Sequence, residues 1–153
     1  MKPVDSLFKH HPEKGQIGDC HRAVIASLLE MKVEKVPHFF DYPMKEGGEK
    51  GAEACRVWLR QFGLKHLEIP FTGDTLEKAL EYISYYDSDG YFTLTALSKS
   101  GENHIVVCHK GKIVHDPTYG DPHGIVGPTN TGGYWWFGWL VPLDPSIRGR
   151  YEY

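Results

Sequence analysis

The sequence predicts an α+β fold in which helices come first along the chain and antiparallel strands follow. Apolar residues recur three and four positions apart in the N-terminal half, as in amphipathic helices. Short runs rich in β-branched and aromatic residues, separated by glycine, dominate the C-terminal half. The chain has 153 residues and 41% of them are hydrophobic, which suits a single core. We therefore expect one domain spanning residues 1–153, with its helices packed on a C-terminal sheet.

Composition and charge argue against several classes of protein. The formal net charge is −3, and Lys and Arg are interspersed with acids, so we expect no nucleic-acid partner. The polar N-terminal segment lacks the apolar core of a signal peptide, and the longest apolar run, 134–142, is too short to cross a bilayer. Three cysteines without a CxxC pair favour neither a disulfide framework nor a zinc finger. We expect a cytoplasmic protein with no membrane contact, no metal and no cofactor.

Two helices are expected in the first half of the chain. Residues 20–31 combine good helix formers with few polar side chains, and Asp19 stands where an N-cap would lie. Residues 51–62 place apolar side chains at i, i+3, i+4 and i+7, and Gly63 follows as a C-cap. Between these helices, 32–51 contains two prolines and a glycine cluster, which predicts an irregular loop.

A third helix and five strands complete the prediction. Asp74 and Glu77 form a plausible capping box ahead of an apolar helical stripe that ends at Ile83. The expected strands are 66–71, 91–97, 103–109, 112–117 and 134–142. The first of these strands precedes the third helix and the other four follow it.

Cys20 is the cysteine best placed for chemistry, because it opens the first predicted helix. The helix dipole and the free N–H groups of a first turn favour the thiolate, which is the nucleophilic form. Gly18 would let the chain turn sharply and leave room for a substrate backbone. Gln16 could place a side-chain amide beside the sulfur and stabilise an oxyanion. The plainer alternative, a buried structural cysteine, suits Cys55 and Cys108 better.

A cysteine nucleophile needs a base, and the C-terminal half supplies His104 with Asp116 as its orienting partner. The intervening turn decides whether these two residues share a face of the sheet. A three-residue loop at 109–111, with glycine last, pairs Cys108 with Lys112. His104 then lies directly opposite Asp116, within reach of its carboxylate. A two-residue turn would put them on opposite faces, so we expect the three-residue loop.

Four further residues are candidates near the site. His115 could compete as the base, although its side chain should point to the opposite face of the sheet. His38 lies in a proline-containing loop and could line a pocket. Trp136 alternates with Trp135 in the last strand, so one of them should face the core and the other could line a groove. Asp19, directly before the cysteine, is a candidate substrate contact.

The candidate residues occur in a familiar chain order. A helix-initiating Cys20, then His104 at a strand start, then Asp116 on the next strand resembles the order in papain-like cysteine peptidases. Shorter relatives, such as bacteriocin-processing peptidases and NlpC-type amidases, are similar in scale. Segments 15–40 and 102–117, with GDCHRAVIASLL and NHIVVCHKGKIVHDP, also look like those of small uncharacterised proteins from tailed phages and bacteria.

The resemblance implies a papain-like fold and a cysteine-dependent hydrolase that cleaves an amide bond through an acyl-enzyme. Cys20 matches the nucleophile, His104 the base and Asp116 the third member of the triad. Gln16 matches the oxyanion glutamine less closely, because that residue usually lies further upstream of the cysteine. The implied partner is a peptide, isopeptide or peptidoglycan-type substrate, met in the host cytoplasm if a phage encodes the protein.

Three other functions remain open from the sequence. An acyl transferase would use the same acyl-enzyme with an acceptor other than water. A binding or inhibitor protein with a papain-like fold would carry an ordinary thiol at Cys20. A metal site would combine Cys20 and His104 with Asp19 or His38, although their spacing is not diagnostic.

Overall fold

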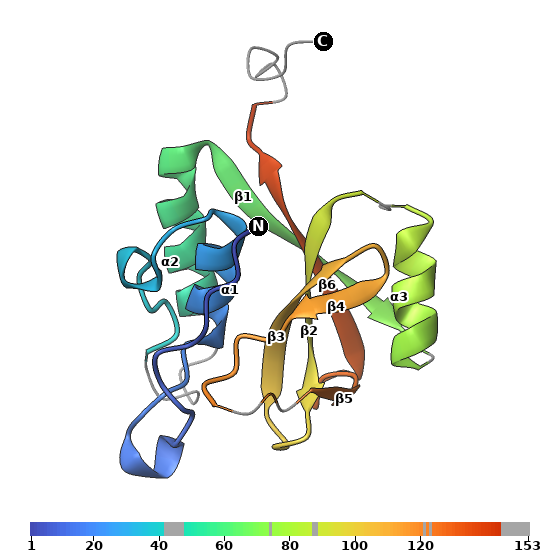
Figure 1. Ribbon diagram of the computed structural model, residues 1–153, viewed down its shortest axis with the longest axis horizontal. Helices are drawn as coiled ribbons and strands as arrows, with labels where there is room; N and C mark the ends of the chain where they lie inside the picture. Colours follow the sequence, from blue (N-terminus) through green and yellow to red (C-terminus); the bar gives the residue numbers. More distant parts are fainter. Residues whose placement is uncertain (42–47, 74, 87–88, 121, 123, 145–153) are drawn as a thin grey trace.

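The computed structural model combines helices with one antiparallel sheet (Figure 1). It describes residues 1–41, 48–73, 75–86, 89–120, 122 and 124–144. The α-helices within this part are α1 (Cys20–Leu28), α2 (Glu49–Leu59) and α3 (Leu76–Ser84). The strands are β1 (Leu64–Thr72), β2 (Tyr91–Ser98), β3 (Asn103–His109), β4 (Lys112–His115), β5 (Ile125–Gly127) and β6 (Tyr134–Pro142). Short 3₁₀ turns lie at η1 (Pro12–Lys14), η2 (Val33–Lys35) and η4 (Arg60–Phe62).

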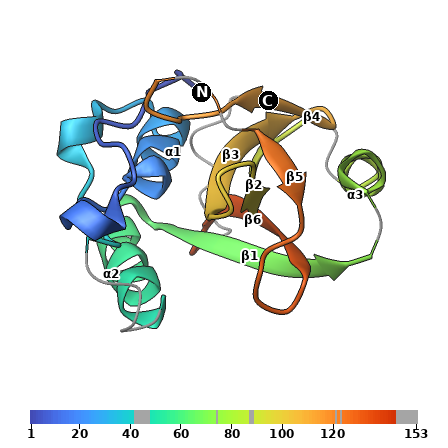
Figure 2. The same cartoon turned by 90° about the horizontal axis from the view of Figure 1, so that it is seen from below.

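The six strands form a single sheet with helices on both of its faces. The strand order is β1-β6-β2-β3-β4, and β5 pairs with the end of β2. Helices α1 and α2 lie on one side and α3 on the other (Figures 1 and 2). The mixed helix-and-sheet class and the antiparallel sheet expected from the sequence are therefore confirmed.

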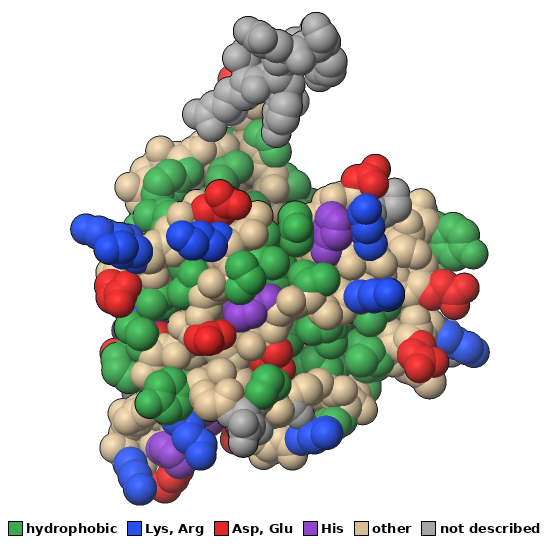
Figure 3. Space-filling model, in the orientation of Figure 1, with side chains coloured by type: hydrophobic (Ala, Val, Ile, Leu, Met, Phe, Trp, Pro, Cys, Tyr) green, Lys and Arg blue, Asp and Glu red, His purple; other side chains and the backbone are tan. Residues whose placement is uncertain are grey.

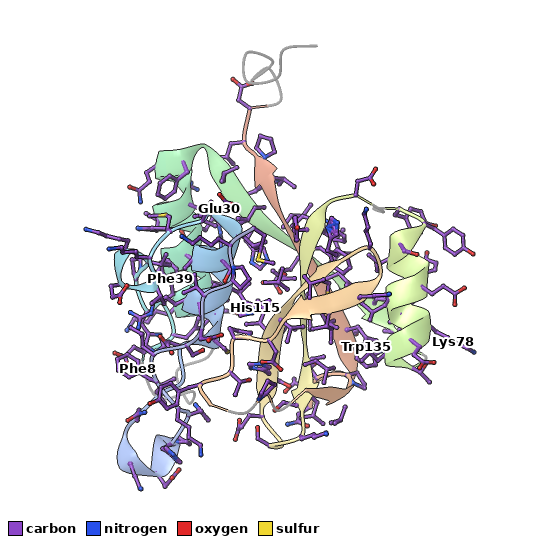
Figure 4. The ribbon with its side chains drawn as sticks, viewed as in Figure 1. Phe8, Glu30, Phe39, Lys78, His115 and Trp135 are labelled. Carbon is purple, nitrogen blue, oxygen red and sulfur yellow. The ribbon has the colours of Figure 1, made fainter. Side chains whose placement is uncertain are left out.

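The larger core lies between α3 and the sheet. The apolar stripe of α3 meets alternate residues of β2, β3 and β6, and Phe92, Trp135 and Phe137 are its largest fully buried side chains. Figure 4 shows Trp135 on the side of the sheet that faces α3. Burial of each such side chain contributes about 1.5–3 kcal/mol. Trp135 is thus the core-facing member of the pair that the alternation in the last strand predicted.

Helix α1 is clamped between the sheet and α2, which fixes where Cys20 lies. Val24 packs on Ile105 and Val107 of β3, and all three side chains are at most 4% exposed. The opposite side of α1 packs against α2 through Cys55 and other residues of a second apolar cluster. Cys20 itself contacts the cluster formed by Val24, Ile105 and Val107, so the start of α1 is held against β3.

The ends of the helices differ from the expected ones in two places. Helix α1 stops at Leu28, three residues early, and Glu30 then adopts a left-handed conformation with φ 56°. The cap of α3 is Thr75, whose Oγ1 accepts a hydrogen bond from the Lys78 N–H. The expected cap, Asp74, lies outside the described residues. Gly63 closes the α2–η4 segment in a left-handed conformation, as predicted.

Two local features were not expected from the sequence. The N-terminal segment contains the 3₁₀ turn η1, which begins at Pro12 and ends at the left-handed Gly15. A short strand, β5, forms within a stretch rich in glycine and proline. It pairs with Leu97 and Ser98 at the end of β2.

The β3–β4 hairpin follows a different path from the predicted one. His109 pairs with Lys112, so the turn has two residues, and the three-residue loop is wrong. Lys110 and Gly111 both have positive φ (50° and 71°), as a type I′ turn requires. Such a turn matches the twist of the flanking strands, which explains why it forms even with lysine at its first position.

A β-bulge then shifts the register of this hairpin by one residue. Cys108 pairs with Ile113, whereas Val107 pairs with His115, so Val114 is an extra residue in β4. Since strand side chains alternate between faces, one extra residue reverses the faces of all residues that follow it. The bulge therefore brings Asp116 to the side of His104, the outcome that the wrong loop was expected to give.

The surface carries charges of both signs. On the face shown in Figure 3, Lys and Arg side chains are interspersed with Asp and Glu. Within the described residues, no helix has the length and apolar character needed to cross a membrane.

Candidate active site

Cys20 is the first residue of α1 and a half-buried free thiol. The chain approaches it along Gly18, whose N–H donates to His10 Nδ1 at 3.2 Å. A Cβ at position 18 would lie 3.0 Å from the His10 Cβ, so the close packing of these two chain segments favours glycine here. Gly18 also lines the cleft described below, as a residue that leaves room for substrate would.

Asp19 stands at the N-cap position, but its carboxylate does not cap the helix. It is 1% exposed and accepts the backbone N–H groups of Leu7 (3.2 Å) and Phe8 (3.0 Å). Arg22 forms an ion pair with it at 2.6 Å. The predicted side-chain cap is therefore wrong: Asp19 ties the N-terminal segment to the helix start and leaves the first-turn N–H groups without a side-chain acceptor.

His104 lies at the start of β3, with only 9% of its surface exposed, between Cys20 and Asp116. Its Nε2 is 2.7 Å from Asp116 Oδ1. The ring also lies beside the Cys20 side chain, whose interaction with it helps to raise the pKa of His104. The structure thus brings together the three residues proposed from the sequence as nucleophile, base and orienter.

Asp116 is held in place by a residue that the sequence analysis missed. Thr118 donates to Asp116 Oδ1 through both its backbone N–H (3.1 Å) and its hydroxyl (2.5 Å). Gly124 N–H donates to Oδ2 at 3.2 Å. The Thr118 Oγ1 also lies 3.2 Å from His104 Nε2. An Asp that bonds the backbone two residues on is an Asx-turn, so Asp-Pro-Thr was a usable signal.

These contacts shift the pKa values of the pair in opposite directions. Burial alone would lower the pKa of His104, but its hydrogen bonds with Asp116 and Cys20, and their charges, raise it to about 9. Burial would raise the pKa of Asp116, but the bonds from His104 and Thr118 hold it far below its usual range. At neutral pH the ring is therefore a cation beside a carboxylate and a thiol. A cation at that position favours the thiolate.

Cys20 and His104 open onto a cleft of about 540 Å³. One wall comes from the N-terminal segment, including Phe8 and His10, and from the approach to α1. The other comes from the β2–β3 turn and from the loops that carry Thr118 and Asn130. The candidate nucleophile and base are thus accessible to a substrate several atoms across.

Gln16 and His38 are not among the residues that line this cleft. The Gln16 amide donates to the Lys9 carbonyl at 2.8 Å, because the η1 turn folds that part of the chain back on itself. His38 Nε2 lies 3.0 Å from the Ile17 carbonyl, and its ring stacks on Phe8. Both residues therefore contact residues of the cleft wall without lining the cleft themselves.

Trp136 and His115 also lie away from the cleft lining. Trp136 is half-buried on β6 and packs edge-on against Tyr134 at 5.8 Å. His115 pairs with Val107 and its Nε2 donates to the Val4 carbonyl at 2.8 Å. Figure 4 shows His115 between the α1 layer and the sheet, where it anchors the N-terminal segment. It does not compete with His104 for the thiol.

Within the described part of the chain, no group of three or more His, Cys, Asp or Glu side chains is arranged to hold a metal ion. The Cys20–His104 pair is completed by Asp116 and Thr118, which bind the ring and each other. Comparison of the chain with models of protein families, with curated proteins and with solved structures finds no match.

Proposed function

We propose that this protein is a papain-like, cysteine-dependent hydrolase that cleaves an amide bond in a peptide-type substrate. The observation that carries the proposal is the chain of contacts from Cys20 through His104 to Asp116 at the base of an open cleft. A nucleophile, a base and a residue that orients the base are the parts that covalent acyl transfer needs. The packing of α1 on the antiparallel sheet supports the papain-like assignment.

The reaction begins with the thiolate of Cys20 and the imidazolium of His104. The sulfur attacks the substrate carbonyl carbon, and the negative oxygen that forms accepts hydrogen bonds from the uncapped N–H groups of the first turn of α1, that of Cys20 first. His104 gives its proton to the amide nitrogen, the C–N bond breaks and the amine leaves. The product bound to the enzyme is a thioester on Cys20.

Water completes the cycle. His104, now neutral, takes a proton from a water molecule as that water attacks the thioester carbonyl. The C–S bond breaks, the carboxylic acid product leaves, and the thiolate–imidazolium pair is restored. Asp116 stabilises the imidazolium in both steps through its 2.7 Å bond to Nε2. An acceptor amine in place of water would make the same site an acyl transferase.

The cleft and the cysteines favour a peptide substrate in a reducing compartment. The lining includes Lys9 on one side and Glu13 and Glu102 among its acids, so it is not a basic surface for nucleic acid. Peptide, isopeptide and peptidoglycan-type amides all fit this description. The three cysteines are free, which is typical of proteins that act in a cytoplasm, including that of a phage-infected host.

The test is the pH dependence of alkylation at each cysteine by iodoacetamide, read by peptide mass spectrometry. We expect Cys20 to react well below pH 8.5, the ordinary thiol range. His104→Ala should return it to that range, because the cation that favours the thiolate is gone. His109→Ala, at the other end of the same strand, is the matched control and should leave Cys20 unchanged.

Two other cysteines serve as internal references. Burial raises the pKa of Cys55 to about 12 and that of Cys108 further, so neither should be alkylated in the folded protein. If Cys20 reacts as an ordinary thiol in the unmodified chain, the hydrolase proposal fails. A binding or inhibitor protein with the same fold then becomes the better explanation.

A further inference from the structure

A second, smaller cavity of about 130 Å³ adjoins the catalytic cleft. His21 and Phe40 line both, so the two spaces are neighbours separated by these side chains. The Phe40 ring packs so closely on α2 that a Cβ at Gly51 would overlap it, which fixes this wall. The remaining walls come from α2 and β1, and the residues are Ala52, Cys55, Arg56, His66 and Glu68.

His66 and Glu68 form a connected polar network on β1. His66 Nδ1 lies 3.3 Å from Glu68 Oε1, and its Nε2 lies 2.9 Å from the Thr93 hydroxyl. Burial lowers the pKa of His66 to about 4, so the ring is neutral at pH 7. One arrangement satisfies both contacts: Nδ1–H donates to the Glu68 carboxylate, and Nε2 accepts from Thr93.

Two acceptors in this cavity remain available to a ligand. Glu68 is 35% exposed, and among the described residues it contacts the neutral His66, so a negative charge on its carboxylate is not offset there. Among the described residues, the His21 ring packs edge-on against Phe39, Phe40 and His66, and its buried Nδ1 has no hydrogen-bond partner. Burial lowers the pKa of His21 to about 3, so this ring is neutral as well and offers a lone pair.

Among the described residues that line the cavity, the only Lys or Arg is Arg56, and it already has a partner. Arg56 forms an ion pair with Glu53 at 2.8 Å on the outer surface of α2. An anionic ligand would therefore meet the Glu68 charge without a free counter-charge among the described lining residues. An apolar ligand would leave the carboxylate and the imidazole unpaired, which is unfavourable in a partly buried site.

We propose that this cavity is a specificity subsite that binds a primary ammonium group of the substrate, such as the end of a lysine side chain near the scissile amide. An ammonium carries three donors and one positive charge, which match the Glu68 carboxylate and a neutral imidazole. The cavity has room for about four waters, at roughly 30 Å³ each, and so for a short aliphatic amine. The inference rests on the proposed hydrolase function for its role in catalysis, but not for the binding itself.

The experiment is a titration with n-butylammonium, followed through the ring resonances of His21 and His66 in ¹H–¹³C NMR spectra of the full chain. We expect saturable shifts of both rings. Glu68→Gln, which keeps the shape and removes the charge, should weaken binding at least tenfold. Glu81→Gln, at an exposed position of α3 on the other face of the sheet, is the matched control and should leave the affinity unchanged. The readout needs no turnover, so it is independent of whether Cys20 is catalytic.

Two further probes of the same chain length are compared with n-butylammonium: n-butanol, which is neutral, and butyrate, which is negatively charged. Equal shifts with n-butanol would mean that charge plays no part, and stronger shifts with butyrate would mean that Arg56 governs the cavity. Either result overturns the proposal. So does the absence of shifts with all three probes, because the cavity would then hold water alone. If n-butylammonium binds but Cys20 is unreactive, the ammonium site stands and the hydrolase proposal falls.

Discussion

Thr118 shows how much of the site depends on a residue with no chemistry of its own. Its hydroxyl contacts both Asp116 and His104, and its backbone N–H holds the same carboxylate oxygen. It therefore fixes the angle at which the carboxylate meets the ring. Cys20, His104 and Asp116 were recognisable as candidates because each has a distinctive type and place along the chain. Thr118 was missed because threonines are common and only the contact reveals its role.

Thr118→Val removes the hydroxyl and keeps the shape of the side chain. A hydrogen bond to a charged group contributes about 1.5–3 kcal/mol, so we expect kcat/KM on an amide substrate to fall at least tenfold. The pKa of His104 should fall as well, and NMR titration of its ring would measure it. Thr118→Ser should restore both values. An unchanged pKa in the valine variant would show that Thr118 is only a structural residue.

The raised pKa of His104 also predicts how stability depends on pH. The ring binds its proton more tightly in the folded protein (pKa about 9) than in the unfolded chain (about 6.5). The resulting stabilisation is complete below pH 6.5 and is lost as the pH rises through 9. Urea unfolding should show a decrease of up to roughly 3 kcal/mol over this range. In His104→Gln this part of the decrease should be absent.

At the level of single elements, the sequence predicted the types of helices and strands better than their exact pairing. The apolar spacing identified α2 and α3, and the alternation identified β6, since these patterns depend on local geometry. The bulge at Val114 has no such signature, because it depends on how two strands settle against each other. Asp116 was expected beside His104, but for the wrong reason.

The turn of the same hairpin gives a stability prediction. Lys110 has φ 50°, a conformation that asparagine tolerates better than lysine. Lys110→Asn creates the Asn-Gly pair preferred in type I′ turns, and should stabilise the fold by about 0.5–1 kcal/mol in urea unfolding. Gly111→Ala is the opposing variant and should destabilise the fold, since φ is 71° there. Equal stabilities for the three proteins would argue against this turn.

On the scale of the whole molecule, the N-terminal segment joins the layer of helices to the sheet. Val4 bonds to Ser27 of α1 and accepts from His115 of β4. Ser6 N–H donates to the Pro117 carbonyl, on the sheet side, at 2.8 Å. Cys20 lies on the layer of helices and His104 on the sheet, so this N-terminal segment helps to keep the proposed nucleophile and its proposed base together. Contacts between residues so distant in sequence could not be predicted from local pattern.

Asp19 links the N-terminal segment to α1. Its carboxylate accepts hydrogen bonds from two backbone N–H groups of that segment and forms the ion pair with Arg22. Asp19→Ala leaves Arg22 without its buried partner and should cost about 3–5 kcal/mol of unfolding free energy. Hydrogen exchange should accelerate at the N–H groups of Leu7 and Phe8. Asp89→Ala, at an exposed position far from this segment in the sequence, is the control and should change neither measurement. Unaltered exchange in Asp19→Ala would mean that other contacts hold the N-terminal segment in place.

The bulge in β4 means that the number of residues between the turn and Asp116 decides which face of the sheet the aspartate occupies. While the turn stays as it is, one residue added to or deleted from β4 moves the aspartate to the other face, and a second one moves it back. In variants with one or two residues inserted between Lys112 and His115, activity should therefore be lost at one and recovered in part at two. Residues added to the turn itself leave the strand pairing unchanged, so the parity of β4, and not the length of the hairpin, decides whether the aspartate faces His104.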